Sequence, residues 1–274
     1  MGEPALSAVG TLARDGDEAR FLAALFAPVA KREPLFALIA FNAELAKIPV
    51  SVSEPILGEI RLTWWREALD DMFDRDIARG HEVLEALIAA HRTRPFDRAA
   101  LTSLIDARLF ALSDEPAAEG AVDAFLRDTG GAYHRLAVAA LGGDDAAQEV
   151  AALAGIAEGA GRLIMATQVA LAGGGAAPFM AGPDTEALQE PDAQADMRTS
   201  LRALATKGLV SLTKARARRN AVPRAARAPL LSVHTAEPVL RHAASQDFDL
   251  TSLGEPSPFR ARASLLGRAL LGRF

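Results

Sequence analysis

The chain has 274 residues, with 30 Lys and Arg against 35 Asp and Glu, which gives a formal charge of −5 at pH 7. Half of the residues are hydrophobic and 24% are charged, values that exclude wholesale disorder. The absence of cysteine excludes disulfide scaffolds, thiolate metal sites and cysteine nucleophiles. The acidic balance gives no reason to expect nucleic acid as a partner.

The N-terminal segment has no basic stretch followed by an apolar one, so no secretory signal is predicted. No uncharged apolar run reaches the roughly 18 residues of a membrane-spanning helix. We therefore expect a cytoplasmic protein, with peripheral attachment to the inner face of the membrane left open. Residues 1–16 are predicted to form a tail and residues 17–274 a single domain.

The apolar residues recur with helical spacing along the whole chain, and no window alternates as a strand would. The first helix is predicted to begin at Asp17 and to stop near Pro28. The later helices are predicted at about 34–47, 53–74, 80–92, 97–112, 117–141, 145–172, 192–219, 223–243 and 257–272. This pattern predicts one all-α domain.

Two of these helices are expected to form the centre of the fold. Helix 34–47, which Pro49 is predicted to end, is apolar around most of its circumference, so it should be buried. Helix 53–74 carries an apolar stripe that should pack near it, and both tryptophans are expected to be core residues. The stripe consists of Leu62, Trp65, Leu69 and Met72.

The segment from Arg32 to Asp71 reads REPLFALIAFNAELAKIPVSVSEPILGEIRLTWWREALDD. It resembles the squalene/phytoene synthase family, in which an ALYAFCR…DDIVDE helix precedes a helix containing R…W…AL. The later AGIAEGAGRLIMA (154–166) resembles the second motif helix of that family, and GGGAAPFM (173–180) falls where the family usually has GRVYLP. The resemblance spans roughly residues 17–245 and implies an isoprenoid-synthase-like helical bundle.

Members of that family with synthase activity bind two prenyl diphosphates through Mg²⁺ ions held by an aspartate-rich motif on each of two facing helices. Carboxylate oxygens are the ligands that Mg²⁺ prefers. Here the first motif has Ala46, Lys47 and Val50 at the aspartate positions, and residues 162–172 contain no Asp or Glu. The resemblance therefore implies that both metal sites are dismantled and that no cofactor is bound.

One branch of the family, the complex I assembly factors, shares this appearance. Its typical segments AFNxELAxI, VSE and RLQWWR are matched by AFNAELA (40–46), VSE (52–54) and RLTWWR (61–66). The resemblance implies a non-catalytic protein that assists assembly of respiratory complex I (NADH:quinone oxidoreductase). Subunits or assembly intermediates of that complex would be its partners, with an isoprenoid or lipid ligand left open. The alternative is a Mg²⁺-dependent transferase acting on prenyl diphosphates.

The resemblance also indicates residues that would line a degenerate pocket. They come from the two motif helices (34–47 and 145–172), from helix 53–74, and from a position that commonly holds tyrosine in the family. Arg61 is expected to reach inward to Glu44, and Glu158 and Arg162 to pair across one helical turn. Structural and anion-binding roles both stay open. The candidates are Asn42, Glu44, Lys47, Arg61, Phe125, Glu158 and Arg162.

The sequence Asp70–Asp71–Met72–Phe73–Asp74 spells DDxxD, the metal motif of another class of prenyl transferases. On a helix, however, Asp70, Asp71 and Asp74 lie away from the apolar stripe, and Arg66 can pair with Asp70. We expect a solvated surface here, and a metal site is the alternative.

A basic stretch late in the chain contrasts with the acidic whole. We consider it for contact with a partner or an anionic membrane, and a solvated helix end is the alternative. It contains Lys214, Arg216, Arg218, Arg219, Arg224 and Arg227.

The remaining motifs give no further site. The five histidines lack paired ligand spacing and are expected at the surface or at helix ends. They are His81, His91, His134, His234 and His242.

The glycines at 155, 159 and 161 are expected to let another helix approach closely. The three glycines at 173–175 lack the context of a phosphate loop and suggest a flexible helix end.

Overall fold

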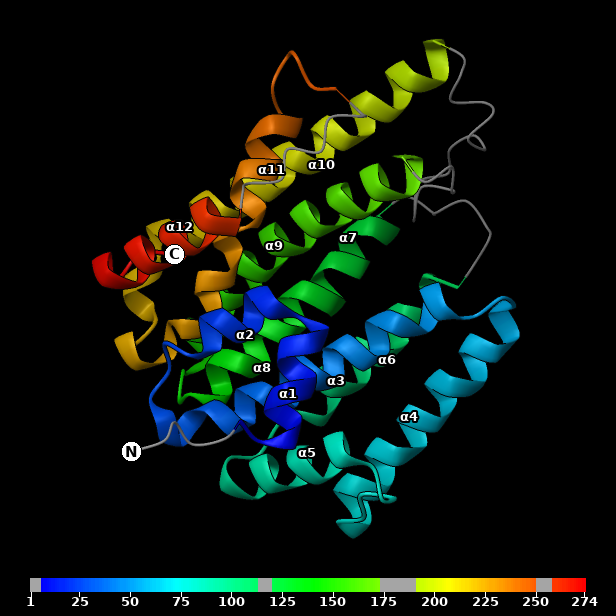
Figure 1. Ribbon diagram of the computed structural model, residues 1–274, viewed down its shortest axis with the longest axis vertical. Helices are drawn as coiled ribbons and strands as arrows, with labels where there is room; N and C mark the ends of the chain where they lie inside the picture. Colours follow the sequence, from blue (N-terminus) through cyan, green and yellow to red (C-terminus); the bar gives the residue numbers. More distant parts are fainter. Residues whose placement is uncertain (1–5, 113–119, 173–190, 250–257) are drawn as a thin grey trace.

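The computed structural model describes residues 6–112, 120–172, 191–249 and 258–274, and within these ranges the regular elements are all helices (Figure 1). The predicted all-α fold is confirmed. The α-helices are α1 (Ala8–Gly16), α2 (Glu18–Ala24), α3 (Arg32–Ser51), α4 (Pro55–Arg75), α5 (Glu82–Thr93), α6 (Arg98–Phe110), α7 (Ala121–Leu126), α8 (Ala132–Ala140), α9 (Asp145–Ala172), α10 (Pro191–Ala217), α11 (Ala236–Ala243) and α12 (Pro258–Leu271).

Helices α3 and α9 run through the interior (Figure 1). Helices α10, α11 and α12 lie to one side of α9, whereas α4 and α5 lie beyond α3. Helices α3 and α9 are both long and apolar enough to cross a membrane by length and composition alone. Most of each apolar window is buried inside the protein, which is the expected environment of a core helix.

The predicted packing of α3 on α4 is confirmed. Phe41 and Leu45 of α3 are fully buried, and the ring of Phe41 meets Trp65 of α4 edge-on at a centroid distance of 5.3 Å. Leu62, Leu69 and Met72 complete the buried stripe of α4. Trp64 is only partly buried and packs against the same core.

A short π-helix, η2 (Arg127–Gly131), joins α7 to α8 and lies directly against α9. A Cβ atom built on Gly155 would fall 2.1 Å from the carbonyl oxygen of Gly130, so only glycine allows this approach. Gly161 meets Ala236 of α11 in the same manner, at 2.7 Å. The close helix approach predicted from these glycines is confirmed.

Several predicted boundaries are wrong. The predicted tail of residues 1–16 contains α1, which Ser7 caps by accepting a hydrogen bond from the Gly10 amide. Pro49 does not end α3, because the helix continues through it for two further residues to Ser51. The predicted helix 117–141 is divided by the π-helix. The predicted helix 223–243 begins as two 3₁₀ turns, η5 (Arg224–Ala226) and η6 (Ala228–His234), because prolines 223 and 229 interrupt the α-helical pattern.

Candidate functional site

A group of charged and polar side chains from four elements meets inside the fold. Its members come from the start of α2, from α6, from α8 and from α9. We call it the charge cluster, and it consists of Asp17, Arg20, Arg108, His134, Glu158 and Arg162.

The centre of the charge cluster is the ion pair between Arg20 and Glu158. The Nη2 of Arg20 lies 2.8 Å from Oε2 of Glu158, and its Nε lies 3.2 Å from the same oxygen. The Arg20 side chain is 4% exposed and the Glu158 side chain is fully buried. The guanidinium also stacks over the ring of Tyr133, 3.7 Å from the ring centroid. A guanidinium is suited to this position, because it forms two hydrogen bonds at its edge while its face covers an aromatic ring.

Arg162 joins the two carboxylates of the charge cluster. Its Nη2 donates to Glu158 Oε1 at 3.0 Å and lies 2.9 Å from Asp17 Oδ2. Asp17 in addition caps α2, since its Oδ1 accepts the Arg20 amide at 3.0 Å. Burial alone would raise the pKa of Glu158, but the charges of Arg20 and Arg162 hold that pKa well below its usual value. Glu158 is therefore ionised, and guanidinium groups engage both carboxylates.

Arg108 adds a third positive charge without a third carboxylate. Its Nη2 donates to Asn42 Oδ1 at 3.2 Å, and its guanidinium carbon lies 5.7 Å from the centre of the Phe125 ring. Burial, together with the charges of Arg20 and Arg162, lowers the pKa of Arg108 to about 10, so it stays protonated at pH 7. The three arginines and two carboxylates of the charge cluster leave it with one net positive charge.

His134 borders the charge cluster as a neutral imidazole. Burial lowers its pKa to about 4, although Glu158 acts in the opposite direction. With the proton on Nδ1, the ring donates to the Gly130 carbonyl oxygen at 3.0 Å, and Nε2 lies 3.3 Å from Ser232 Oγ. The expectation that the histidines lie at the surface or at helix ends is wrong for His134, which is fully buried, whereas His234 is 4% exposed but is the last residue of η6. His81 and His91 do lie at helix ends, where each Nδ1 accepts a backbone amide.

The structure brings together part of the predicted pocket. Asn42, Phe125, Glu158 and Arg162 meet in and around the charge cluster. The other three candidates do not reach it, because Glu44 pairs with Lys47 at 2.9 Å on the exposed side of α3 and Arg61 donates to Ser51 Oγ at 3.1 Å. The predicted contact between Arg61 and Glu44 is wrong. Arg20 and Arg108 were not predicted, since neither lies in a motif segment.

The charge cluster does not fit Mg²⁺, the ion that the family resemblance would bring to this interior. Its two carboxylates are already paired with guanidinium groups, and its net charge is positive. The Nε groups of Arg108 and Arg162 are buried donors with no hydrogen-bond partner among the described residues. Free N–H donors favour an anion or a water molecule over a cation. Within the described ranges no three His, Asp or Glu side chains are grouped as a metal site would need.

The DDxxD sequence lies on the outer side of α4. Arg98 at the start of α6 pairs with Asp70 at 2.6 Å and with Asp74 at 2.7 Å, and Arg79 pairs with Asp71 at 2.6 Å. Arg66 pairs with Asp106 and not, as expected, with Asp70. Each of the three carboxylates thus already has an arginine partner.

The basic stretch separates into two groups. Arg216 pairs with the mostly buried Glu237 at 2.6 Å, and Arg218 pairs with Glu149 at 2.6 Å. In contrast, no carboxylate partner is found within the described residues for the others, which are Lys214, Arg219, Arg224 and Arg227. Arg219 and Arg227 donate to backbone carbonyl groups, and Lys214 and Arg224 are exposed.

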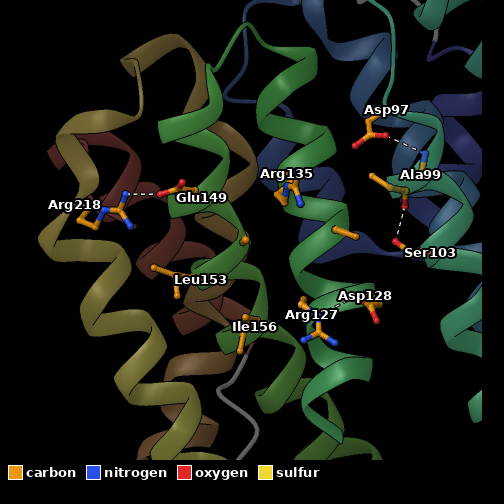
Figure 2. Close-up of a pocket in the computed structure, with 13 residues that line it drawn as sticks. Asp97, Ala99, Ser103, Arg127, Asp128, Arg135, Glu149, Leu153, Ile156 and Arg218 are labelled. Carbon is orange, nitrogen blue, oxygen red and sulfur yellow. Dashed lines mark hydrogen bonds and ion pairs between the residues drawn. The ribbon is translucent and has the colours of Figure 1, made fainter. Parts of the chain in front are cut away.

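A separate groove of about 530 Å³ lies between α6, α8 and α9 (Figure 2). Leu153 and Ile156 of α9 contribute its apolar part, and the Arg218–Glu149 pair lies at one side. Its three arginines are matched by Asp97, Asp128 and Glu149, so the groove has no predominant charge. Arg135, which points into it, is exposed and has no charged partner within the described ranges.

Comparison with known proteins places this geometry in context. Residues 13–170 match the sequence profile of the squalene/phytoene synthase family, and this segment contains the whole charge cluster. A crystal structure of a dehydrosqualene synthase in complex with ligand superposes with a TM-score of 0.72 over 96% of this chain and 95% of that one. The sequence identity is 14%, so this likeness shows a shared fold.

The similar curated proteins carry a different name. A segment of 104 residues is 35% identical to the NADH dehydrogenase (ubiquinone) complex I, assembly factor 6 of Bos taurus, over 38% of this chain and 31% of the relative. The protein of that name from Homo sapiens is 39% identical over 62 residues, which are 23% of this chain and 19% of the relative. The match thus spans at most about a third of the length of these relatives.

Proposed function

The chain belongs to the squalene/phytoene synthase family, and from this premise we propose that it assists assembly of respiratory complex I without synthase chemistry. It would act by contact with subunits or assembly intermediates of the complex. It would work from the cytoplasm, at the inner face of the membrane. The similarity to mammalian proteins named as complex I assembly factors supports the choice of partner.

The single observation that carries the proposal is the pairing of Glu158 with Arg20 and Arg162 in the interior. Departure of a diphosphate group needs positive charge that is held for the leaving group, and in this family aspartate-bound Mg²⁺ supplies it. In this chain the interior carboxylates neutralise guanidinium groups instead. We assign to the charge cluster the task of fixing α2, α6 and α9 in one arrangement, with no cofactor.

The transferase alternative has no specific observation in its favour. Its metal site would need Asp70, Asp71 and Asp74, and all three are held by arginines on the outer side of α4. Mg²⁺ could bind there only if these ion pairs were broken. The site would also lie at the surface, which is far less shielded from water than the core. An isoprenoid or lipid bound without turnover is compatible with the assembly role.

Affinity capture from the native membrane fraction tests the proposal. The tagged full chain is expected to enrich complex I subunits or assembly intermediates over an unrelated tagged protein of similar size and charge. Capture is repeated at high salt, which weakens contacts between exposed charges. Recovery of complex I components at the level of the unrelated control would contradict the proposal.

A further inference from the structure

Helix α12 presents apolar side chains on the face that points away from the protein. It packs on η6, and its Leu265 is 4% exposed. Phe259, Leu266 and Leu270 follow one another at spacings of seven and four residues, so they share one face, which lies away from Leu265. Phe259 is 82% exposed and Leu270 is 78% exposed. Residues 258–274 contain four arginines and no acidic residue, although Arg262 pairs with Glu18 and Arg268 with Glu237.

The surface next to the C-terminal end of α12 is basic as well. A hollow of about 300 Å³ lies between the end of α12, the 3₁₀ turns and the loop after α2, and every charged residue lining it is an arginine. Within the described residues, Arg224 and Arg273 have no carboxylate partner, and Arg227 donates only to carbonyl oxygens. Burial lowers the pKa of Arg227, and so do the charges of Arg224 and Arg219. Three unneutralised cations therefore lie together in a protein of net negative charge.

Apolar residues surround these arginines. Phe26, Leu270 and Leu271 line the same hollow, and Leu271 is 69% exposed. We call this region the α12 surface, and it comprises Phe26, Arg224, Arg227, Phe259, Leu266, Leu270, Leu271 and Arg273.

We propose that the α12 surface docks the protein on a membrane that contains anionic phospholipid. Arg224, Arg227 and Arg273 contact lipid phosphate groups, while Phe259, Leu266 and Leu270 enter the boundary between headgroups and acyl chains. A helix with a basic margin and large exposed apolar residues is suited to lie in the plane of that boundary. The inference rests on charge and exposure at this surface and does not depend on the proposed role in complex I assembly.

The same observations favour a membrane over an acidic protein. Acidic side chains of a protein would pair with the arginines only, whereas the Phe259–Leu266–Leu270 stripe needs an apolar environment to leave water. The stripe extends from one end of α12 to the other, whereas the arginine-lined hollow lies only at its end. A membrane surface covers both features at once.

Flotation of the full chain with vesicles tests the proposal. Vesicles of phosphatidylcholine alone are compared with vesicles of phosphatidylcholine and phosphatidylglycerol in equal amounts, at low and high salt. The wild-type chain is expected to float with the anionic vesicles at low salt and to stay unbound with the neutral ones. Arg224→Glu and Arg273→Glu should each weaken binding by about fivefold or more, since each basic residue near such a surface contributes about that factor. Leu270→Ser should weaken it as well.

Two matched controls separate this surface from general effects. Arg135→Glu makes the same charge change in the groove of Figure 2, and Ile60→Ser makes a similar change at an exposed position of α4. Both should float like the wild type, and circular dichroism checks that all five variants are folded. The proposal is overturned if the wild type does not float with anionic vesicles, or if Arg135→Glu loses as much binding as Arg224→Glu. Binding that depends on Arg224 but not on Leu270 would also overturn it, because the apolar stripe would then take no part in the contact with the membrane.

Discussion

Arg20 and Glu158 are 138 positions apart in the sequence, yet the Arg20 Nη2 lies 2.8 Å from Glu158 Oε2 in the interior of the protein. The pair connects the second helix of the chain to the long central helix α9. A charged pair that is removed from water needs such hydrogen bonds, because its desolvation is otherwise costly. The relationship explains why a synthase-like interior can hold carboxylates without offering them to a metal.

Replacing Arg20 with methionine should destabilise the protein by about 3–5 kcal/mol, because it leaves Glu158 charged and buried with one partner fewer. Urea unfolding followed by circular dichroism measures the change. The double variant Arg20→Met with Glu158→Leu should recover part of the loss, and Arg92→Ala, which breaks the exposed pair with Asp76, should have little effect. An Arg20→Met variant as stable as the wild type would refute this account of the charge cluster.

Replacing Gly155 with alanine should cost about 3 kcal/mol or more, because the new methyl group would have to displace the backbone of Gly130. Gly267→Ala is the matched control in α12, where a Cβ atom would meet nothing within 4 Å. That change should be neutral or should stabilise by up to about 1 kcal/mol, since alanine favours helix more than glycine does. Equal unfolding midpoints for the two variants would show that η2 and α9 are not in tight contact.

Stability should fall as the pH is lowered from about 6.5 towards 4. His134 has a folded-state pKa of about 4, whereas in the unfolded chain it titrates near its model value of 6.5. Between these values the unfolded state binds more protons, so stability is lost on acidification, by up to about 1.4 kcal/mol per pH unit. Burial lowers the pKa of His234 in the same direction. Unfolding free energies at pH 7, 6 and 5 should show a shallower slope for His134→Gln than for the wild type. Identical slopes would contradict the assignment of a neutral, buried His134.

No release of diphosphate from farnesyl or geranylgeranyl diphosphate should be measurable with Mg²⁺ present. The reason is that Glu158 and Asp17 neutralise arginines, while the sequence resemblance implies Lys47 and Val50 at positions of metal ligands. A synthase of the same family with intact aspartate motifs serves as the positive control. Release above that of heat-killed protein, and abolished by EDTA, would show that a metal site exists elsewhere in the chain.

The fold was predictable because its signals are local. The apolar circumference of α3 and the stripe of α4 follow from helical spacing within 21 residues or fewer, and the structure confirms both. The pair of Glu158 and Arg162 was predictable for the same reason, since its members are four residues apart. Missed features such as the turns at 224–234 depend on prolines whose effect is decided by the surrounding packing.

The charge cluster was only partly predictable, because most of its contacts join distant segments. Asp17 was recognised as a helix cap, and it is one, but its second contact with Arg162 spans 145 positions. Arg108 lies on a helix with no motif, and its contact with Asn42 spans 66 positions. A single sequence contains no signal that connects these residues, and only the packed structure brings them together.

Deleting the gene in its native host, and measuring NADH:quinone reductase activity in isolated membranes, tests the central claim most directly. The account predicts reduced activity and reduced complex I subunit content, both restored when the wild-type gene is returned, with the isoprenoid profile unchanged. Unchanged complex I activity and subunit content, together with a changed isoprenoid profile, would contradict the account and favour the transferase alternative.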